Sequence, residues 1–188
     1  ISLNCATMQP EDFEINLFGH EASSGGGPRE IGTFEQAHMG TLFLDEVADM
    51  PLETQGKIVR ALQEQTFQRV GGATRVEVDV RVIASSSKDL SNEMSEGRLR
   101  EDLFYRLSVV PVSAPPLKDC REDIPELIAH FMEKMALTNG QNPRIFSAEA
   151  LAALQSYDWP GNVRELRNVI ERILIMAPGD DSTPISPG

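Results

Sequence analysis

Gly40-Thr41-Leu42-Phe43-Leu44-Asp45-Glu46 is the stretch that decides the fold. Its central residues are apolar or β-branched, with a glycine in front and two adjacent carboxylates behind. Short apolar runs of this kind are typical of a strand that is buried on both faces of a parallel sheet. The stretch therefore predicts a central strand of an α/β domain, with Asp45 and Glu46 at its carboxyl end.

The carboxylates of Asp45 and Glu46 should point to different sides of the strand end, because side chains alternate along a strand. Ligands of open α/β sheets bind at this edge. One carboxylate can help to hold Mg²⁺ through water while the other polarises an attacking water, as in the Walker B arrangement of P-loop ATPases. A core strand that runs into an acidic loop is an equally good interpretation of these residues alone, because the chain contains 29 Asp and Glu.

Composition and charge set the limits for the rest of the chain. Its 188 residues, 40% of them hydrophobic, can bury a real core. The net charge of −12 should repel phosphate backbones, so DNA binding is expected from another part of the protein. No apolar stretch approaches the roughly 20 residues of a membrane span and no signal peptide pattern is present, which predicts a cytoplasmic protein without a membrane partner. Cys5 and Cys120 are too few and too far apart for a disulfide framework or a zinc site.

The residues before the central stretch predict three smaller features. Residues 1–3 resemble a strand entered in its middle, so we expect the chain to be a piece of a longer protein. Residues 22–28 are rich in Gly and Ser and predict a flexible loop. Residues 32–38 predict a short helical turn that leads to the central strand.

The residues after the central stretch predict a helix followed by strands. Asp49 is the expected N-cap of this helix, with Pro51 in its first turn. The later expectations are a hairpin at 67–78, a core strand at 82–84, a helix over 99–107 that carries Arg100 and Arg106, and a proline-containing edge strand at 109–112.

Ala114-Pro115-Pro116 predicts a domain boundary. It divides the chain into an α/β part over 1–113, a helical part over 114–178 and a Pro/Ser linker or tail over 179–188. Three helices are expected in the second part: one over 124–135, one that starts at Ser147, and one that starts at Asn162, where Glu165 completes a capping box.

The P-loop motif G-x-x-x-x-G-K-[ST] does not occur in these 188 residues. Backbone amides and the lysine of that motif supply most of the grip on ATP in P-loop folds. The chain alone is therefore expected to bind no nucleotide, whatever the carboxylates do in a longer protein.

Arg164 still indicates a phosphate site. It lies close to the start of its predicted helix, where a cation costs about 0.3–1 kcal/mol unless an anion compensates. An exposed arginine that leans on Glu165 or Asp158 is an equally good interpretation.

Arg100 and Arg106 could present cations to the phosphate of a neighbouring subunit, as arginine fingers do. Their spacing alone slightly favours a simpler interpretation, in which they are solvated partners of Glu101 and Asp102.

Six runs, in their order along the chain, resemble the AAA+ domain of bacterial sigma-54-dependent transcription activators. The runs are Leu3-Asn4-Cys5-Ala6, Leu17-Phe18-Gly19-His20-Glu21, residues 40–46, 79–84 and 100–107, and Trp159-Pro160-Gly161-Asn162-Val163-Arg164-Glu165-Leu166. The likeness extends to about Pro178. It implies an AAA+ P-loop NTPase-like parallel sheet flanked by helices, with the first strand and the P-loop missing, and a small all-α lid domain.

The resemblance implies roles for the acidic residues and for Asn4. Asp45 and Glu46 are expected to be the Walker B pair, with Asp45 holding Mg²⁺ through water and Glu46 activating the attacking water. Asn4 is expected to restrain Glu46 until the partner protein is engaged.

It also implies polar residues around the nucleotide. Arg100 and Arg106 are expected to be fingers that reach the nucleotide of the adjacent protomer, and Arg164 is expected to be the sensor II arginine of the lid. Ser87 stands where the family usually has the sensor I asparagine, and its shorter hydroxyl would reach a γ-phosphate less well.

In this family, ATP turnover in a ring of subunits remodels sigma-54 RNA polymerase, usually between a receiver domain and a helix-turn-helix domain. The family's Gly-Ala-Phe-Thr-Gly-Ala loop should follow Glu21, but residues 22–31 contain no aromatic residue. A loop that contacts its partner mainly through one aromatic residue loses most of its binding energy when that residue is absent. The missing loop makes contact with the sigma factor doubtful, and it resembles the NtrX branch of nitrogen-regulation response regulators.

Three interpretations follow from this resemblance. The first is the central module of an NtrX-like, two-component, DNA-binding regulator of nitrogen metabolism, which binds ATP and Mg²⁺ in the intact parent and self-associates through AAA+ interfaces. The second is an active ATPase that remodels sigma-54 RNA polymerase. The third, expected for the chain by itself, is a non-catalytic interaction fragment that binds no nucleotide, so enzymatic activity is left open.

Overall fold

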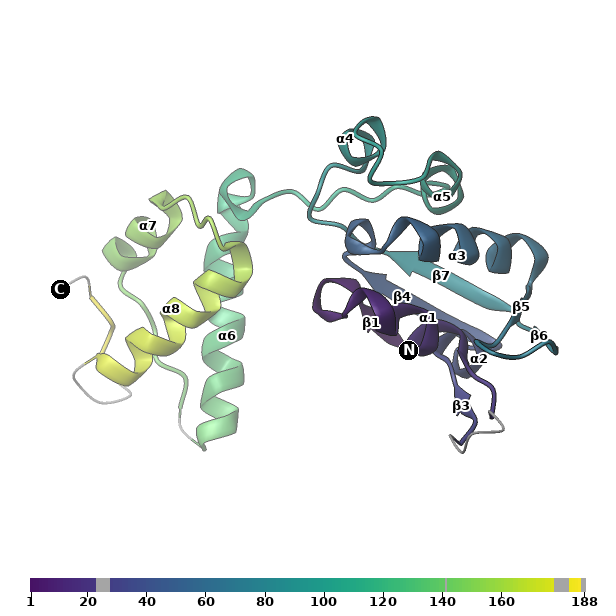
Figure 1. The fold of residues 1–188 in the computed structure, drawn as a ribbon. Coiled ribbons are helices and arrows are strands. Elements are labelled where there is room, and N and C mark those ends of the chain that lie inside the picture. Colours follow the sequence, from purple (N-terminus) through teal and green to yellow (C-terminus); the bar gives the residue numbers. More distant parts are fainter. Residues whose placement is uncertain (23–27, 141, 178–182, 187–188) are drawn as a thin grey trace. The chain divides into compact units, whose positions relative to one another are not determined.

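The computed structural model describes residues 1–22, 28–140, 142–177 and 183–186. It divides into two compact units, Ile1–Pro111 and Val112–Gly188 (Figure 1). Three small sheets and five helices of the first unit are described, whereas the described part of the second unit is helical. The predicted loop at 22–28 falls largely outside the described residues.

The main sheet of the first unit has three parallel strands in the order β1-β4-β7. They are β1 (Ser2–Asn4), β4 (Gly40–Asp45) and β7 (Val80–Ala84). Leu42 and Leu44 of β4 are fully buried, whereas Phe43, on the other face, is half-buried. The predicted central strand of a parallel sheet is confirmed, although the described residues cover its second face only in part.

Helices pack with this sheet into one core, and Figure 1 shows α3 running along the length of the sheet. The helices are α1 (Phe13–Phe18), α2 (Thr33–Gln36), α3 (Leu52–Glu64), α4 (Leu90–Ser95) and α5 (Glu101–Leu107). Short 3-10 turns lie at Cys5–Thr7, Pro10–Asp12 and Val47–Asp49. Phe13, Phe34, Ile58 and Leu103 are buried side chains of this core.

Two antiparallel pairs complete the unit: β2 (Gly19–His20) with β3 (Glu30–Ile31), and β5 (Thr66–Gln68) with β6 (Arg75–Glu77). The second pair confirms the predicted hairpin. It immediately precedes β7, so it lies at the end of the main sheet opposite to Asp45 (Figure 1).

Two helix starts differ from the prediction. The N-cap of α3 is Pro51, because Asp49 lies in a 3-10 turn and its carboxylate pairs with Lys88. Helix α5 begins at Glu101, so Arg100 is its N-cap and does not lie on the helix.

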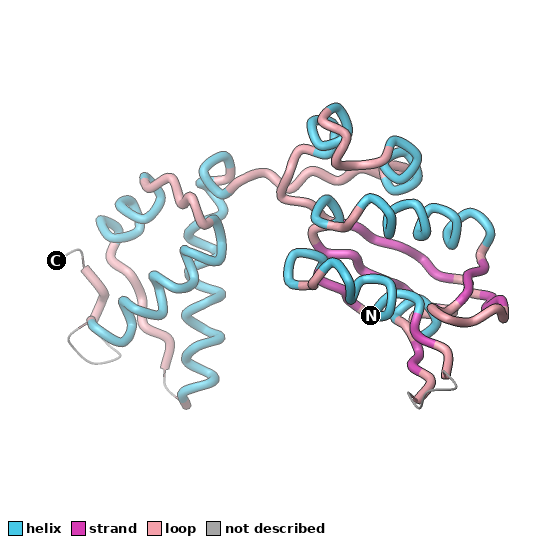
Figure 2. Tube along the Cα trace, viewed as in Figure 1, coloured by secondary structure: helices cyan, strands magenta, loops and turns pink. Residues whose placement is uncertain are grey.

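The predicted edge strand at 109–112 is wrong, and Figure 2 shows this segment as loop. Val109, Val110 and Val112 are 75%, 78% and 89% exposed. Valine favours a strand only where neighbouring strands cover it, and none of the described strands pairs with this segment. Pro111 also lacks the N–H that a ladder needs.

The second unit contains α6 (Ile124–Asn139), α7 (Ala148–Ser156) and α8 (Asn162–Met176), with 3-10 turns at Leu117–Asp119 and Arg121–Asp123. Its core includes Ile128 of α6 and Leu166 and Ile170 of α8. The Ser147 hydroxyl accepts a 3.2 Å hydrogen bond from the Ala150 N–H, so the predicted cap of α7 is confirmed.

The start of α8 differs from the predicted capping box. The Asn162 side-chain oxygen accepts from the Leu117 N–H at 2.8 Å and caps nothing in its own helix. Glu165 does reach back, but it accepts from the Gly161 N–H at 2.8 Å.

Part of the predicted linker belongs to this unit. Ile185 is buried, and its backbone bonds to Ile145 and Ser147. No helix in the described ranges is both long and apolar enough to cross a membrane.

Candidate functional site

Three polar side chains meet at the carboxyl end of the main sheet because of the strand register. Asn4 of β1 pairs with Asp45 of β4, and Ser85 directly follows the pair formed by Leu44 and Ala84. The Asn4 amide donates to Asp45 Oδ2 at 3.3 Å, and the Ser85 hydroxyl donates to Asp45 Oδ1 at 2.5 Å. The Asp45 carboxylate is therefore held from both neighbouring strands.

Glu46 turns away from the strand in a left-handed backbone conformation, with φ 56° and ψ 52°. Its N–H donates to the Ser85 Oγ at 3.3 Å. Its carboxylate accepts from both the N–H and the hydroxyl of Ser87, each at 2.9 Å. The structure thus brings Asp45, Glu46 and Ser87 to one edge and fixes each carboxylate separately.

The contact of Asn4 differs from the one that the family resemblance implied. Asn4 donates to Asp45, and the described partner of the Glu46 carboxylate is Ser87. Ser85 was missed at the level of sequence. The run Ser85-Ser86-Ser87 after a core strand was the available signal, because it ends at the same edge as Asp45.

Cys5 directly follows Asn4, and its pKa responds to the negative charges at this edge. Burial raises the pKa of the Cys5 thiol to about 12, with further increases from the negative charges of Asp49, Asp45 and Glu46. A thiol that stays protonated is a poor nucleophile and a poor metal ligand. The Cys5 thiol is therefore protonated at neutral pH.

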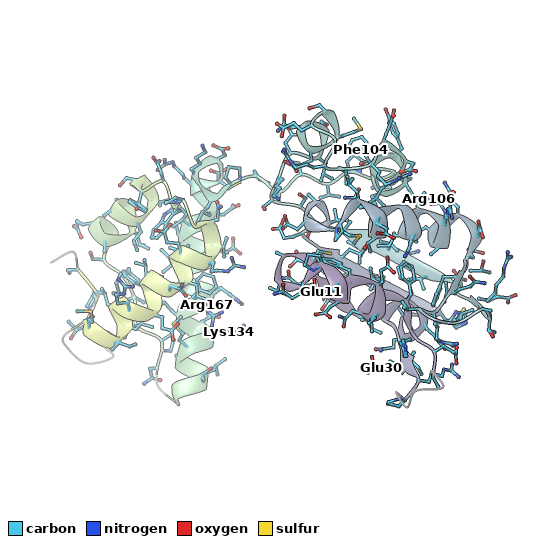
Figure 3. All side chains as sticks on the ribbon, in the orientation of Figure 1. Glu11, Glu30, Phe104, Arg106, Lys134 and Arg167 are labelled. Carbon is cyan, nitrogen blue, oxygen red and sulfur yellow. The ribbon has the colours of Figure 1, made fainter. Side chains whose placement is uncertain are left out.

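Arg100 and Arg106 are engaged inside their own unit. Arg100 forms two hydrogen bonds with the carboxylate of Asp102, at 3.0 and 2.8 Å, which raise the pKa of Arg100 and lower the pKa of Asp102. Arg106 reaches from α5 to α3, where it donates to the Leu62 carbonyl oxygen at 2.8 Å (Figure 3). Both arginines are exposed, so either could exchange these partners for another anion.

Arg164 is an exposed residue in the first turn of α8, in the second unit. Neither carboxylate that could have neutralised it does so. Glu165 accepts from the Gly161 N–H, and Asp158 pairs with Arg121. No partner for the Arg164 guanidinium is found in the part of the chain that the structure describes.

The donor set at the sheet edge fits a Mg²⁺ ion only through intervening water. Within the described ranges, no three His, Cys, Asp or Glu side chains are arranged to hold a metal. Each Asp45 oxygen accepts one hydrogen bond and keeps a further lone pair, which suits a metal-bound water. The 188 residues place two carboxylates at the sheet edge and lack the P-loop motif that cradles phosphates.

A parallel sheet with a carboxylate pair at its edge and a separate helical unit define the AAA+ class of domains. The family model of the sigma-54 interaction domain matches residues 1–113, and that of the AAA+ ATPase lid domain matches residues 118–185. The chain therefore belongs to the sigma-54 interaction domain family, and the predicted family and fold class are confirmed.

Its relatives include nitrogen regulators. The chain is 50% identical over 186 residues to the nitrogen assimilation regulatory protein NtrX of Azorhizobium caulinodans, which covers 99% of this chain and 41% of the relative. The crystal structure of NtrX from Brucella abortus in complex with ATP matches with a TM-score of 0.91 at 49% identity, over 99% of this chain and 41% of that one. The chain thus spans about two fifths of the length of these relatives.

A more distant structure shares the fold alone. The S. cerevisiae Hsp104:casein complex matches with a TM-score of 0.67 at 17% identity, over 93% of this chain and 34% of that one.

Proposed function

We propose that this chain is the central AAA+ module of an NtrX-like response regulator. In this proposal the parent is a two-component, DNA-binding transcription regulator of nitrogen metabolism, located in the cytoplasm, whose assembly responds to ATP. The observation that carries it is the 50% identity to an NtrX protein over 99% of the chain. The absence of an aromatic residue from 22–31 supports the same branch, because the hot spot of a sigma-contacting loop is missing.

The carboxylates have distinct roles in this proposal. Bound MgATP supplies the phosphoanhydride bond that water can break. Asp45, fixed by Asn4 and Ser85, would hold Mg²⁺ through water, and Glu46 would polarise the attacking water. Ser87 fixes the Glu46 carboxylate through two hydrogen bonds, which Glu46 would have to give up to bind that water.

The arginines are phosphate-binding residues in this proposal. Arg100 and Arg106 would exchange Asp102 and the Leu62 carbonyl for the phosphates of an adjacent copy. Arg164 of the helical unit would also bind a phosphate, because no described residue neutralises its charge. DNA is bound by a domain outside this chain, because a segment with net charge −12 does not favour a phosphate backbone.

The intact parent tests this proposal. We expect it to bind genomic promoter fragments in a gel-shift assay and to change its sedimentation coefficient when MgATP is added. If it hydrolyses ATP, Glu46→Gln should lower the rate about a hundredfold or more while ATP still binds, because water loses its base. Glu53→Gln, which removes an exposed carboxylate from α3, is the matched control and should change little. A parent that binds no promoter DNA would contradict the regulator proposal.

The family match over 1–113 favours a second candidate, an ATPase that remodels sigma-54 RNA polymerase. Purified transcription from a sigma-54 promoter separates the two. Stimulation by the intact protein would favour the second candidate, and no stimulation would favour the first. For the 188-residue chain itself we expect calorimetry with MgATP to detect no binding, because its sequence has no P-loop motif.

A further inference from the structure

A cavity lies in the first unit, at the end of the main sheet opposite to Asp45. Its volume is about 550 Å³, within the range of small-ligand pockets. One wall is the face of α3 that carries Lys57, Arg60, Ala61 and Glu64, at the i, i+3, i+4 and i+7 spacing of a single helical stripe. The end of α1 and the β5–β6 hairpin, which Figure 1 shows beyond the end of α3, form the remaining walls.

Two of the four cations that line this cavity are already neutralised. Arg69 is 7% exposed, and its guanidinium donates to the carboxylates of Glu35 and Glu21 at 2.8 to 3.0 Å. Lys57 pairs with Glu14 and, at 3.6 Å, with Glu53. These pairs build a rigid wall and leave little charge for a ligand.

The other two cations, Arg60 and Arg75, are exposed, and their side chains make no hydrogen bond or ion pair with any described residue. Glu64, one turn from Arg60, forms no ion pair with it, so it neutralises this charge only in part. Gly71 also lines the cavity, and its N–H makes no hydrogen bond within the described ranges. The cavity therefore offers two guanidinium groups and a main-chain donor that a chain of net charge −12 has not used itself.

Four apolar residues line the cavity between the charged groups: Phe18, Ala61, Phe67 and Val70. Val70 is half-buried and offers most of the apolar surface, whereas the other three are at most 8% exposed. A ligand that fits both features carries an aliphatic group next to one or more anionic groups.

We propose that this cavity is a docking site for an acidic peptide segment with an aliphatic side chain. The carboxylates of the segment pair with Arg60 and Arg75, since a guanidinium fork matches a carboxylate. The aliphatic side chain lies against Val70, the half-buried apolar residue of the lining. This inference does not depend on nucleotide chemistry at the opposite end of the sheet.

The aromatic residues favour a peptide over a nucleic acid strand. Single-stranded nucleic acids gain much of their affinity by stacking bases on open aromatic faces. Phe18 and Phe67 are 3% and 8% exposed, and both pack against Phe34, with ring centroids 5.6 and 6.2 Å from it. No ring face is open there for a base, whereas an aliphatic side chain can pack against the half-buried Val70.

Calorimetry on the 188-residue chain tests the proposal with the capped peptide acetyl-Glu-Glu-Leu-Glu-Glu-amide as the probe. We expect saturable one-to-one binding at low ionic strength that weakens with added salt. The double variant Arg60→Glu/Arg75→Glu should weaken binding roughly tenfold or more, because attraction becomes repulsion. If that variant does not fold by circular dichroism, Arg60→Gln/Arg75→Gln serves instead and should also lose roughly tenfold.

The matched control is Arg167→Glu/Arg172→Glu, which makes the same change in net charge on exposed positions of α8. It should leave peptide binding within about twofold, since neither arginine lines the cavity and only the overall charge changes. The analogue with Gln in place of Glu should bind at least roughly tenfold more weakly, and that with Ser in place of Leu also more weakly. No binding of the probe, an equal loss in the control variant, or tighter binding of a single-stranded oligonucleotide than of the peptide would overturn the proposal.

Discussion

At the carboxyl end of the main sheet, carboxylates are held by uncharged donors, whereas at the opposite end arginines line a cavity and two of them have no described partner. Asp45 is bonded to Asn4 and Ser85, and Glu46 to Ser87. The guanidinium groups of Arg60 and Arg75 make no hydrogen bond or ion pair with the described residues. Neutral donors fix the position of a carboxylate without cancelling its charge. The carboxylates of Asp45 and Glu46 therefore keep the negative charge that a hydrated cation needs. Unpaired guanidinium groups leave the second end prepared for an external anion.

The largest expected effect concerns the Cys5 thiol, which is buried near the negative charges of the first end. The pKa of Cys5 is raised to about 12, so below that pH the thiol stays protonated and the nucleophilic thiolate is scarce. We expect iodoacetamide to alkylate Cys5 in the folded chain about a thousandfold more slowly than an unperturbed thiol. Mass spectrometry of the alkylated peptides measures the rates. Concentrated urea should restore the reactivity of Cys5, and fast alkylation in the native chain would show that its burial and its acidic surroundings are absent.

Both ends depend on β4, which joins them. Leu44 is fully buried, so Leu44→Ala should lower the free energy of unfolding by about 3 kcal/mol. Ile83 in the neighbouring strand is 50% exposed, and Ile83→Ala should cost about 1 kcal/mol. Urea unfolding followed by circular dichroism measures both. Equal losses would mean that β4 is no more central than β7.

The paired cation at the second end should matter more for stability than its unpaired neighbours. Arg69→Met leaves Glu21 and Glu35 without their shared partner and should destabilise the chain by about 2 kcal/mol, less than for a fully buried pair because both carboxylates are partly exposed. Arg81→Met, at an exposed site without a described partner, should stay within about 0.5 kcal/mol of the parent. The same urea experiment decides, and a loss no larger than that of Arg81→Met would remove the distinction between paired and unpaired arginines.

The smallest effect is expected for the donor that holds the first end. Ser85→Ala removes the hydroxyl that Asp45 and the Glu46 N–H share, and it should cost about 1 kcal/mol. Ser91→Ala, whose hydroxyl makes no bond to the described residues, is the control and should be nearly neutral. If Ser85→Ala is as neutral as its control, the carboxylate is not held in solution.

The accuracy of the sequence predictions follows how local each feature is. The run at 40–46 carries its own apolar pattern, so β4 was predicted from the residues themselves. The valines at 109–112 carry an equally good pattern, but a strand needs a partner, and the described residues supply none. Pattern alone does not contain that information.

Caps were mispredicted for a related reason. Asp49 and Asn162 are good capping residues, yet Asp49 pairs with Lys88 and Asn162 accepts from the Leu117 N–H. Both partners are distant in the sequence, so the competition between them and the helix could not be seen there. Ser147 has no such competitor among the described residues, and its predicted cap formed.

Much of the candidate site could be placed in advance, because parallel strands bring their carboxyl ends to one edge. The structure does bring Asn4, Asp45, Glu46 and Ser87 together, while their proposed roles stay predictions. Which donor holds which carboxylate was beyond reach, since that depends on register and on the turn at Glu46.

That turn sets stability against function at a single position. A left-handed backbone costs a residue with a side chain about 1 kcal/mol or more, and glycine would be relieved of this cost. Glycine would in turn lose the two hydrogen bonds from Ser87 and the acid itself. Directed evolution for heat resistance alone should therefore accept both residues at position 46, and only a selection for activity should exclude glycine.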